Sequence, residues 1–256
     1  MFTDNPNCIE LQKNIFLFKN FFSKKDIEDV NLAMNNGKRT SNINYQHPNE
    51  WFKEDNQSAN IPELFPLWEK ISELIYPEFV IHPQLSLLIN KPGQQGMHTH
   101  TDSPGKSMCR GDNHEACEVS SEDRWMTCCT LEYGAVGYFG DFTGGQLYYP
   151  HITKDGLEQE ERNDYNCFEV QPEPGDLVIH RAYHPYEHGT REVLSGIKYS
   201  FPNFVLTKED NARTFHNYKT PEYYERIKDL NLWCEPLRKN PLFKDGQRVV
   251  PYQKNI

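Results

Sequence analysis

Two histidines and an aspartate alternate in the segment M-H-T-H-T-D, Met97–Asp102. If this segment is a β-strand, His98, His100 and Asp102 all point to the same face. Imidazole and carboxylate groups are common metal ligands. Residues two apart on a strand are separated by about 6.6 Å and can converge on one ion, whereas residues four apart are separated by about 13 Å. His100 is therefore the expected partner of Asp102 at the metal. His98 is expected either to be a partly exposed residue outside the site or to form a hydrogen bond to it.

A metal ion needs at least one further ligand from a distant segment. Three histidines lie downstream, at His180, His184 and His188. His188 is followed ten positions later by Lys198, inside a strand-like run that starts at Gly196. A lysine there offers a compact cation for an anionic group. From spacing alone, His184 and His180 remain alternatives for the third ligand.

Short apolar runs separated by Gly and Pro begin at about residue 79 and provide the elements that would position these side chains. Their β-branched and aromatic content, bounded by turn residues, predicts strands. Strands of this length and spacing predict an all-β barrel or sandwich. The expected strands are Phe79–Ile89, Gln95–Thr101, Trp125–Leu131, Gly145–Tyr149, Cys167–Gln171, Leu177–His180 and Gly196–Leu206.

The N-terminal part predicts a strand over 12–20 and two helices. Ser23 is a good N-cap for a helix over Lys24–Asn35, and Ile61–Ile75 has apolar residues at spacings of three and four. The C-terminal part is expected to be helical around Pro221–Leu230. We predict a single domain over 1–256, divided into an N-terminal support (12–78), a catalytic core (79–206) and a C-terminal helical extension (207–256).

Composition narrows the function classes. A formal net charge of −10 disfavours an electrostatic interaction with nucleic acid or an anionic membrane. The sequence has seven cysteines, no segment like a signal peptide and no apolar run of membrane-spanning length, which predicts free thiols and a cytoplasmic location. Cys109, His114 and Cys117 form an alternative zinc site, which lacks a C-x-x-C pair.

Taken in order, the motifs resemble those of Fe(II)- and 2-oxoglutarate-dependent dioxygenases of the prolyl 4-hydroxylase-like branch. The opening I-F-L-F-K-N-F-F-S-K-K-D-I-E-D-V resembles the strand-then-helix lead-in of that family. The resemblance covers residues 14 to 205, roughly three quarters of the chain. Its motifs are His100-Thr101-Asp102, the G-G-Q-L-Y-Y-P of Gly144–Pro150, Pro174-Gly175-Asp176, His188-Gly189 and Lys198.

The resemblance implies a mainly β (α+β) fold, a double-stranded β-helix or jelly roll. It implies N-terminal helices packed on the larger sheet and a short helical C-terminal tail. The implied iron ligands are His100, Asp102 and His188, the facial set of two imidazoles and one carboxylate. Lys198 is implied to bind the far carboxylate of 2-oxoglutarate, with Thr130 and Asn90 as further contacts of this cosubstrate.

The implied reaction uses Fe(II), 2-oxoglutarate and O₂, with ascorbate as a candidate reductant. It converts 2-oxoglutarate to succinate and CO₂ while a C–H bond is hydroxylated. A proline residue in a peptide or protein is the leading substrate, and another amino acid or a small molecule is the alternative. The sequence does not fix the oligomeric state.

Three other readings remain open. Arg181 and Arg191 compete with Lys198 as the anchor of 2-oxoglutarate. A cupin-type metal module would use His98 with His100 and no 2-oxoglutarate, although the glutamate typical of that pattern is missing after them. The charged segment Ser103–Arg124 departs from the family pattern and leaves the substrate open.

Overall fold

A computed structural model of the chain describes residues 2–36, 57–59, 63–75, 79–82, 87–102, 131–207, 243–244 and 247–248. In these parts the chain is mostly β-strand, arranged in antiparallel sheets, with a short 3-10 helix (η1, Phe2–Asp4) and few helices. The described helices are all too short or too polar to cross a membrane.

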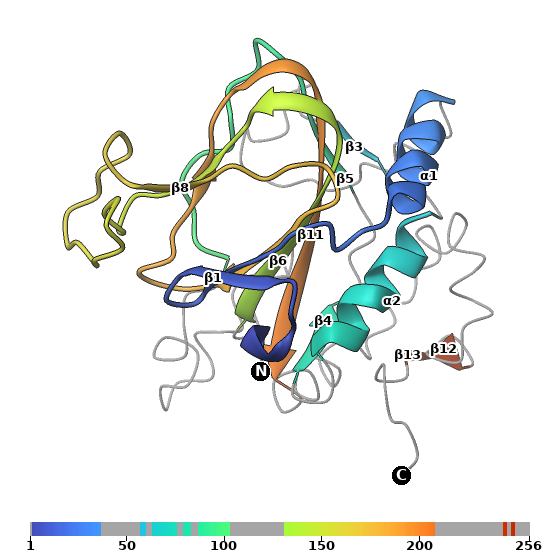
Figure 1. The fold of residues 1–256 in the computed structure, drawn as a ribbon, viewed down its shortest axis with the longest axis horizontal. Helices are drawn as coiled ribbons and strands as arrows, with labels where there is room; N and C mark the ends of the chain where they lie inside the picture. Colours follow the sequence, from blue (N-terminus) through green and yellow to red (C-terminus); the bar gives the residue numbers. More distant parts are fainter. Residues whose placement is uncertain are drawn as a thin grey trace.

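The larger sheet has eight strands in the order β1-β2-β9-β6-β11-β5-β3, and β4 also pairs with β11. Its two longest strands, β6 and β11, run side by side through the middle of the molecule (Figure 1). The strands of this sheet are β1 (Cys8–Gln12), β2 (Ile15–Phe18), β3 (Gln57–Ala59), β4 (Phe79–His82), β5 (Leu87–Asn90), β6 (Leu131–Gly144), β9 (Leu177–Arg181) and β11 (Val193–Thr207).

A smaller sheet has the order β10-β7-β8. Its strands are β7 (Leu147–Tyr149), β8 (Phe168–Val170) and β10 (Gly189–Thr190). A buried cluster joins residues of this sheet, such as Leu147 and Val170, to Ile15 and Val178 of the larger sheet. Two antiparallel sheets packed through one core are consistent with a β-sandwich or jelly-roll architecture. Two further strands, β12 (Phe243–Lys244) and β13 (Gln247–Arg248), pair only with each other in the described residues.

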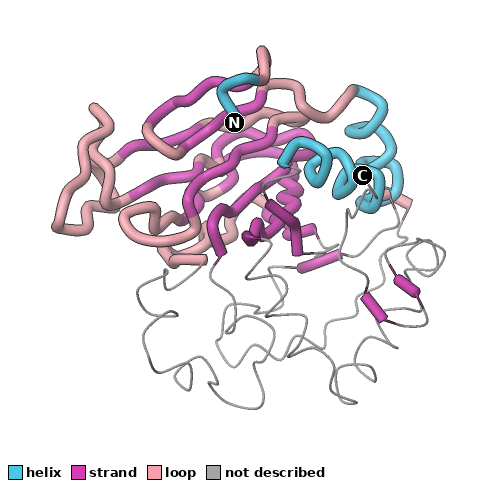
Figure 2. Tube along the Cα trace, turned by 90° about the horizontal axis from the view of Figure 1, so that it is seen from below, coloured by secondary structure: helices cyan, strands magenta, loops and turns pink. Residues whose placement is uncertain are grey.

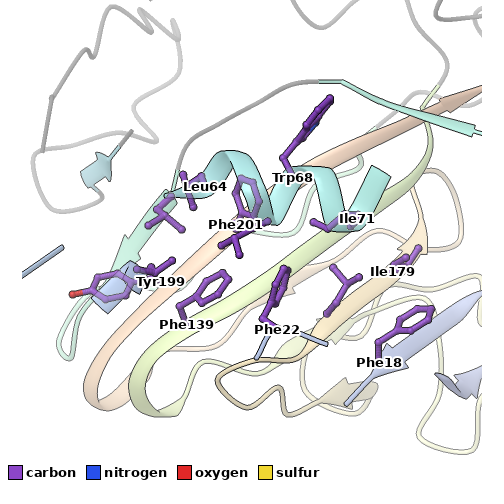
Figure 3. Close-up of a cluster of buried hydrophobic side chains, with 14 of the residues drawn as sticks. Phe18, Phe22, Leu64, Trp68, Ile71, Phe139, Ile179, Tyr199 and Phe201 are labelled. Carbon is purple, nitrogen blue, oxygen red and sulfur yellow. The ribbon is translucent and has the colours of Figure 1, made fainter. Parts of the chain in front are cut away.

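Helices α1 (Lys24–Asn35) and α2 (Leu64–Ile75) lie together on the other face of the larger sheet (Figures 1 and 2). Helix α1 begins with a capping box, in which the Ser23 side chain accepts from the Asp26 N–H and the Asp26 carboxylate accepts from the Ser23 N–H. Figure 3 shows part of the apolar core between α2 and the sheet. It includes Leu64, Trp68 and Ile71 of α2 with Phe139, Ile179 and Phe201 of the strands.

The strands of the larger sheet alternate between these two cores, as the period of two requires. On β9, Leu177 and Ile179 face the helices, whereas Val178 belongs to the core between the sheets. His180 follows Val178 by two positions and lies on the same inner side, near the small-sheet Tyr149. The interior between the sheets therefore receives polar side chains as well as apolar ones.

Two features of the N-terminal part agree with the sequence prediction, and one strand prediction is wrong. The helix Lys24–Asn35 and its Ser23 cap are confirmed. The two ends of the expected strand Phe79–Ile89 are β4 and β5, which pair with successive parts of β11, and residues 83–86 lie outside the described residues. The expected strand Gln95–Thr101 is absent, and within it His100 makes an isolated β-bridge.

Several other predictions fall wholly or partly outside the described residues. These are the helix around Pro221–Leu230, the segment Ser103–Arg124 with its cysteines, the first two residues of the expected helix Ile61–Ile75, and Thr130. Of the expected strand Trp125–Leu131 only the last residue is described, and it begins β6. The expected strand over 12–20 is the four-residue β2, and it is preceded by β1 in a hairpin that the sequence did not reveal.

Candidate active site

The structure brings the side chains of His100, Asp102 and His188 together in the interior between the two sheets. One ligand atom from each of them lies within 4.8 Å of the others. His100 Nε2 is 3.5 Å from Asp102 Oδ1. In the described parts of the chain this is the group of histidine, cysteine and acidic side chains with the spacing of a metal site.

A backbone bridge, rather than a regular strand, holds the group together. The N–H of His100 donates to the carbonyl of His188 at 2.9 Å, and the N–H of His188 donates to the carbonyl of His100 at 2.9 Å. The two rings lie 4.5 Å apart. The strand geometry expected for Met97–Asp102 was therefore wrong, although the pairing of His100 with Asp102 is seen.

Main-chain carbonyls orient both imidazoles. His100 Nδ1 is 2.9 Å from the His98 carbonyl oxygen, and His188 Nδ1 is 3.2 Å from the Tyr186 carbonyl oxygen. A carbonyl only accepts, so each Nδ1 carries a proton, and the neutral form of each ring presents a lone pair at Nε2. This arrangement of the outer hydrogen bond fixes the tautomer that binds a metal. His98 itself is exposed, and its contribution to the site is this carbonyl.

The electrostatics of Asp102 and His188 favour the forms that bind metal, whereas the raised pKa of His100 favours its protonated form. Burial raises the pKa of the Asp102 carboxyl, but His188 and His100 outweigh burial and hold this pKa well below its usual range. Burial, together with the neighbouring His180, lowers the pKa of His188 well below its usual value. Burial also lowers the pKa of His100, but its hydrogen bond to Asp102 makes the net shift upward. An ionised carboxylate and a neutral imidazole are what a metal ion requires.

Lys198 on β11 is fully buried in the same interior. Its Nζ donates to the Gly145 carbonyl at 2.7 Å and lies 5.5 Å from the centre of the Tyr138 ring. Burial lowers the pKa of Lys198 to about 7. No carboxylate of the described residues pairs with this amine, so an anion bound beside it would gain a desolvated counter-charge.

Two tyrosines connect the lysine to the metal ligands, and the sequence reading missed both. Tyr138 and Tyr149 are buried, and neither hydroxyl has a hydrogen-bond partner among the described residues. Tyr149 lies 6.1 Å, ring to ring, from His188. Burial raises the pKa of both tyrosines, so both hydroxyls are neutral donors. Recognition of β6 would have placed Tyr138 on the inner face, two positions after Val136.

Asn90 and Thr130 are the other two predicted contacts of 2-oxoglutarate, and only Asn90 lies within the described residues. Asn90 on β5 is the cross-strand partner of Lys198, directly opposite it in register. Thr130 lies outside the described residues. Gly145, within the predicted G-G-Q-L-Y-Y-P motif, has φ +65° and supplies the carbonyl that Lys198 binds. A Cβ at Gly145 would stand 2.9 Å from Lys198 Cδ, so glycine makes room for the lysine.

The two arginines that competed with Lys198 have other partners. Arg181 pairs with Glu132 at 2.7 Å and stacks over the Tyr133 ring at 4.4 Å. Arg191 pairs with Glu169 and lies 4.0 Å from the centre of the Tyr148 ring. Both guanidinium groups are already neutralised, whereas Lys198 pairs with no described carboxylate.

The two alternative histidine ligands lie in different environments. The side chain of His184 is 68% exposed and is 3.0 Å from Glu187 Oε1. His180 is fully buried, and its ring centre is 4.2 Å from that of His188. Neither belongs to the group with metal-site spacing, but His180 is adjacent to it.

Comparisons with known proteins show similarity at the level of structure. No family model and no curated protein matches the sequence. The viral collagen prolyl hydroxylase of Paramecium bursaria Chlorella virus-1, solved as a 2-oxoglutarate complex, is 12% identical; the match covers 76% of this chain and 96% of that chain, with a TM-score of 0.48. A prolyl hydroxylase from Trichoplax adhaerens, solved with a peptide fragment of the hypoxia inducible factor oxygen degradation domain, is 11% identical; the match covers 78% of this chain and 86% of that chain, with a TM-score of 0.51. The resemblance to prolyl hydroxylases predicted from the motifs is thus confirmed in the fold, which this chain shares with the Trichoplax enzyme.

Proposed function

We propose that this protein is an Fe(II)- and 2-oxoglutarate-dependent dioxygenase on a double-stranded β-helix, with His100, Asp102 and His188 as the iron ligands. The observation that carries the proposal is the presence, in one buried interior, of a two-histidine, one-carboxylate group and a lysine that pairs with no described carboxylate. The first is the donor set of non-haem Fe(II) oxygenases, which leaves coordination positions open. The second fits a dicarboxylate cosubstrate.

The residues present fit such a cosubstrate in both position and chemistry. Lys198 would bind the far carboxylate, and the Tyr138 hydroxyl, which has no partner in the described structure, is a further donor on a ring whose centre is 5.5 Å from that amine. Asn90 lies opposite Lys198, and Thr130 is retained as a proposed contact on the basis of the motif alone. The buried walls of both sheets exclude water from these groups, which strengthens each charge-assisted hydrogen bond.

When bound, iron and 2-oxoglutarate supply the oxidising chemistry: O₂ is consumed, 2-oxoglutarate becomes succinate and CO₂, and a substrate C–H bond becomes C–OH. The chain's own residues bind and orient these groups. Asp102 and the two Nε2 atoms hold the metal, the His98 and Tyr186 carbonyls fix the imidazole orientations, and Lys198 sets the direction of the cosubstrate. We propose ascorbate as the reductant that maintains iron as Fe(II).

A proline residue in a peptide or protein is the proposed substrate. The Trichoplax enzyme, whose fold this chain shares, is a prolyl hydroxylase solved with a peptide. In this chain the hydroxyl of Thr99, which precedes His100, is 2.9 Å from the Tyr148 hydroxyl and accepts from Arg162 at 3.0 Å. The half-exposed Arg162, which also pairs with Asp164, is thereby held to the residue before a proposed ligand and is the proposed donor to the carbonyl groups of a peptide.

Release of succinate from 2-oxoglutarate tests the reaction class. We expect release that requires Fe(II) and is abolished in Asp102→Ala, while His184→Ala, which removes an exposed histidine outside the ligand group, keeps it. Mass spectrometry of proline-containing peptides from the same reactions tests the substrate. The gain of one oxygen atom on proline supports the proposal, whereas succinate release without peptide modification directs the search to other amino acids or small molecules.

A further inference from the structure

His180 is a third imidazole beside the proposed iron ligands, and the reaction proposed above does not use it. It lies on β9, is fully buried, and contacts the ring of His188 at 4.2 Å and the ring of Tyr149 at 5.6 Å between centres. Its Nε2 is buried without a hydrogen-bond partner among the described residues. A buried, unsatisfied polar atom costs about 1–3 kcal/mol, so its presence calls for a physical reason.

The tautomer of His180 is the same as that of the two metal ligands. Its Nδ1 is 3.0 Å from the Arg181 carbonyl oxygen, which only accepts. Nδ1 therefore carries a proton, and the neutral ring presents a lone pair at the buried Nε2, which has no partner among the described residues. All three imidazoles therefore have Nδ1 anchored on a main-chain carbonyl.

Gly134 shows what His180 Nε2 faces. A Cβ built on Gly134 would lie 2.5 Å from Asp102 Oδ2 and 3.1 Å from His180 Nε2, so the carboxylate oxygen and the imidazole nitrogen border the same small space. Gly134 is also the cross-strand partner of His180. Both atoms that border this space are acceptors, so they cannot hydrogen-bond to each other. A group that carries protons or positive charge would satisfy both of them.

We propose that His180 is a positioning residue of the metal centre, whose Nε2 accepts a hydrogen bond from a water molecule held on the metal beside Asp102 Oδ2. The proposal rests on the metal site proposed above and adds a residue outside its three ligands. His180 acts in the outer layer rather than as a fourth ligand, because it lies outside the group whose ligand atoms are all within 4.8 Å of one another. Outer partners of this kind typically contribute about 10–100-fold to metal affinity.

The test compares Co(II) binding to the wild-type protein, His180→Phe and His180→Gln, with His184→Phe as the control for loss of an exposed histidine. His180→Phe keeps the ring volume and removes the acceptor. We expect its Co(II) affinity to fall about 10–100-fold. The melting temperature of the metal-free protein should stay the same or rise, because an unsatisfied polar atom is removed from the interior. In His180→Gln the amide oxygen takes the place of Nε2 as an acceptor, and most of the affinity should return.

A His180→Phe protein that binds Co(II) as tightly as the wild type overturns the proposal. A fall in affinity that His180→Gln fails to recover, at an unchanged melting temperature, also overturns it. Pulsed EPR of the Cu(II)-loaded protein counts coordinated imidazoles; two in both the wild type and His180→Phe support the outer position, and three in the wild type contradict it. A wild-type protein that binds no divalent ion contradicts the proposed iron site itself, so the two failures are distinguishable.

Discussion

The main chains of His100 and His188 are hydrogen-bonded to each other in both directions, at 2.9 Å each way. This bridge joins the end of one segment to the start of β10 and places the two Nε2 atoms near the Asp102 carboxylate. Backbone bonds do not depend on the side chains, so removal of a ligand is expected to empty the site without unfolding it.

Asp102→Asn tests this separation of binding from folding. The amide keeps the shape of the carboxylate and removes its charge, so we expect Co(II) affinity to fall beyond the ~10–100-fold that loss of an outer partner costs. The metal-free protein should stay folded but melt at a lower temperature, because the lowered pKa of Asp102 means that its charge stabilises the fold. Calorimetric titration and thermal melting measure the two effects, and Asp155→Asn, on an exposed loop, is the control. Full Co(II) affinity in Asp102→Asn would remove Asp102 from the ligand set.

Lys198→Met tests the buried amine through the pH dependence of stability. The pKa of Lys198 is about 7 in the folded protein against 10.5 for an ordinary lysine. Between these values the unfolded chain binds a proton that the folded protein does not, so this group's contribution to stability is fully present above 10.5 and is lost as the pH falls through 7. The measurement is urea unfolding of the wild type and Lys198→Met without ligands, at several pH values. The wild-type free energy of unfolding, minus that of Lys198→Met, should rise by a few kcal/mol as the pH increases from 7 to 10.5, since each pKa unit corresponds to about 1.36 kcal/mol. A difference independent of pH would mean that Lys198 keeps its ordinary pKa.

Tyr138→Phe separates cosubstrate binding from stability. The Tyr138 hydroxyl has no partner in the described structure, so its removal should leave the metal-free protein equally stable or more stable. Loss of a hydrogen bond to a charged carboxylate costs about 1.5–3 kcal/mol, which predicts roughly 10–100-fold weaker binding of 2-oxoglutarate. The exposed Tyr165→Phe is the matched control. Unchanged 2-oxoglutarate affinity in Tyr138→Phe would exclude this hydroxyl from the cosubstrate site.

Gly134→Ala and Gly137→Ala form a pair on the same strand. The new methyl group at 134 would lie 2.5 Å from Asp102 Oδ2, and the one at 137 would lie 2.6 Å from the Phe22 ring. Both substitutions overpack the protein and should cost about 1–3 kcal/mol of stability. Metal affinity should fall in Gly134→Ala alone, because only that methyl group displaces a proposed ligand. Equal metal affinity in the two variants would show that Asp102 is not held where the structure places it.

The N-terminal elements could be predicted because local rules decide them. Ser23 and Asp26 form a capping box that depends on residues three apart, and helix α1 begins directly after it. Lys198 could be assigned to the site because it lies in a strand-like run, ten positions after His188. The motif order, rather than any single residue, identified the fold shared with a prolyl hydroxylase.

Strand β6 could not be predicted because four glycines, at 134, 137, 140 and 144, remove the strand signal. The structure explains all four: Gly134 makes room for Asp102 and His180, Gly137 for Phe22, and Gly140 and Gly144 have positive φ angles of +94° and +76°. The same long-range packing hid Tyr138, whose importance depends on a strand that local propensity does not show. Burial of a polar atom is a property of the folded chain, and the sequence does not display it.

Calorimetric titration of the protein with 2-oxoglutarate, in the presence and absence of Mn(II) as an oxygen-stable substitute for Fe(II), tests the central claim most directly. We predict one 2-oxoglutarate bound per chain only when Mn(II) is present, with binding lost in Asp102→Asn and weakened in Lys198→Met. Binding that is independent of the metal, or no binding at all with Mn(II) present, would contradict the assignment of His100, Asp102, His188 and Lys198 to one iron and 2-oxoglutarate site.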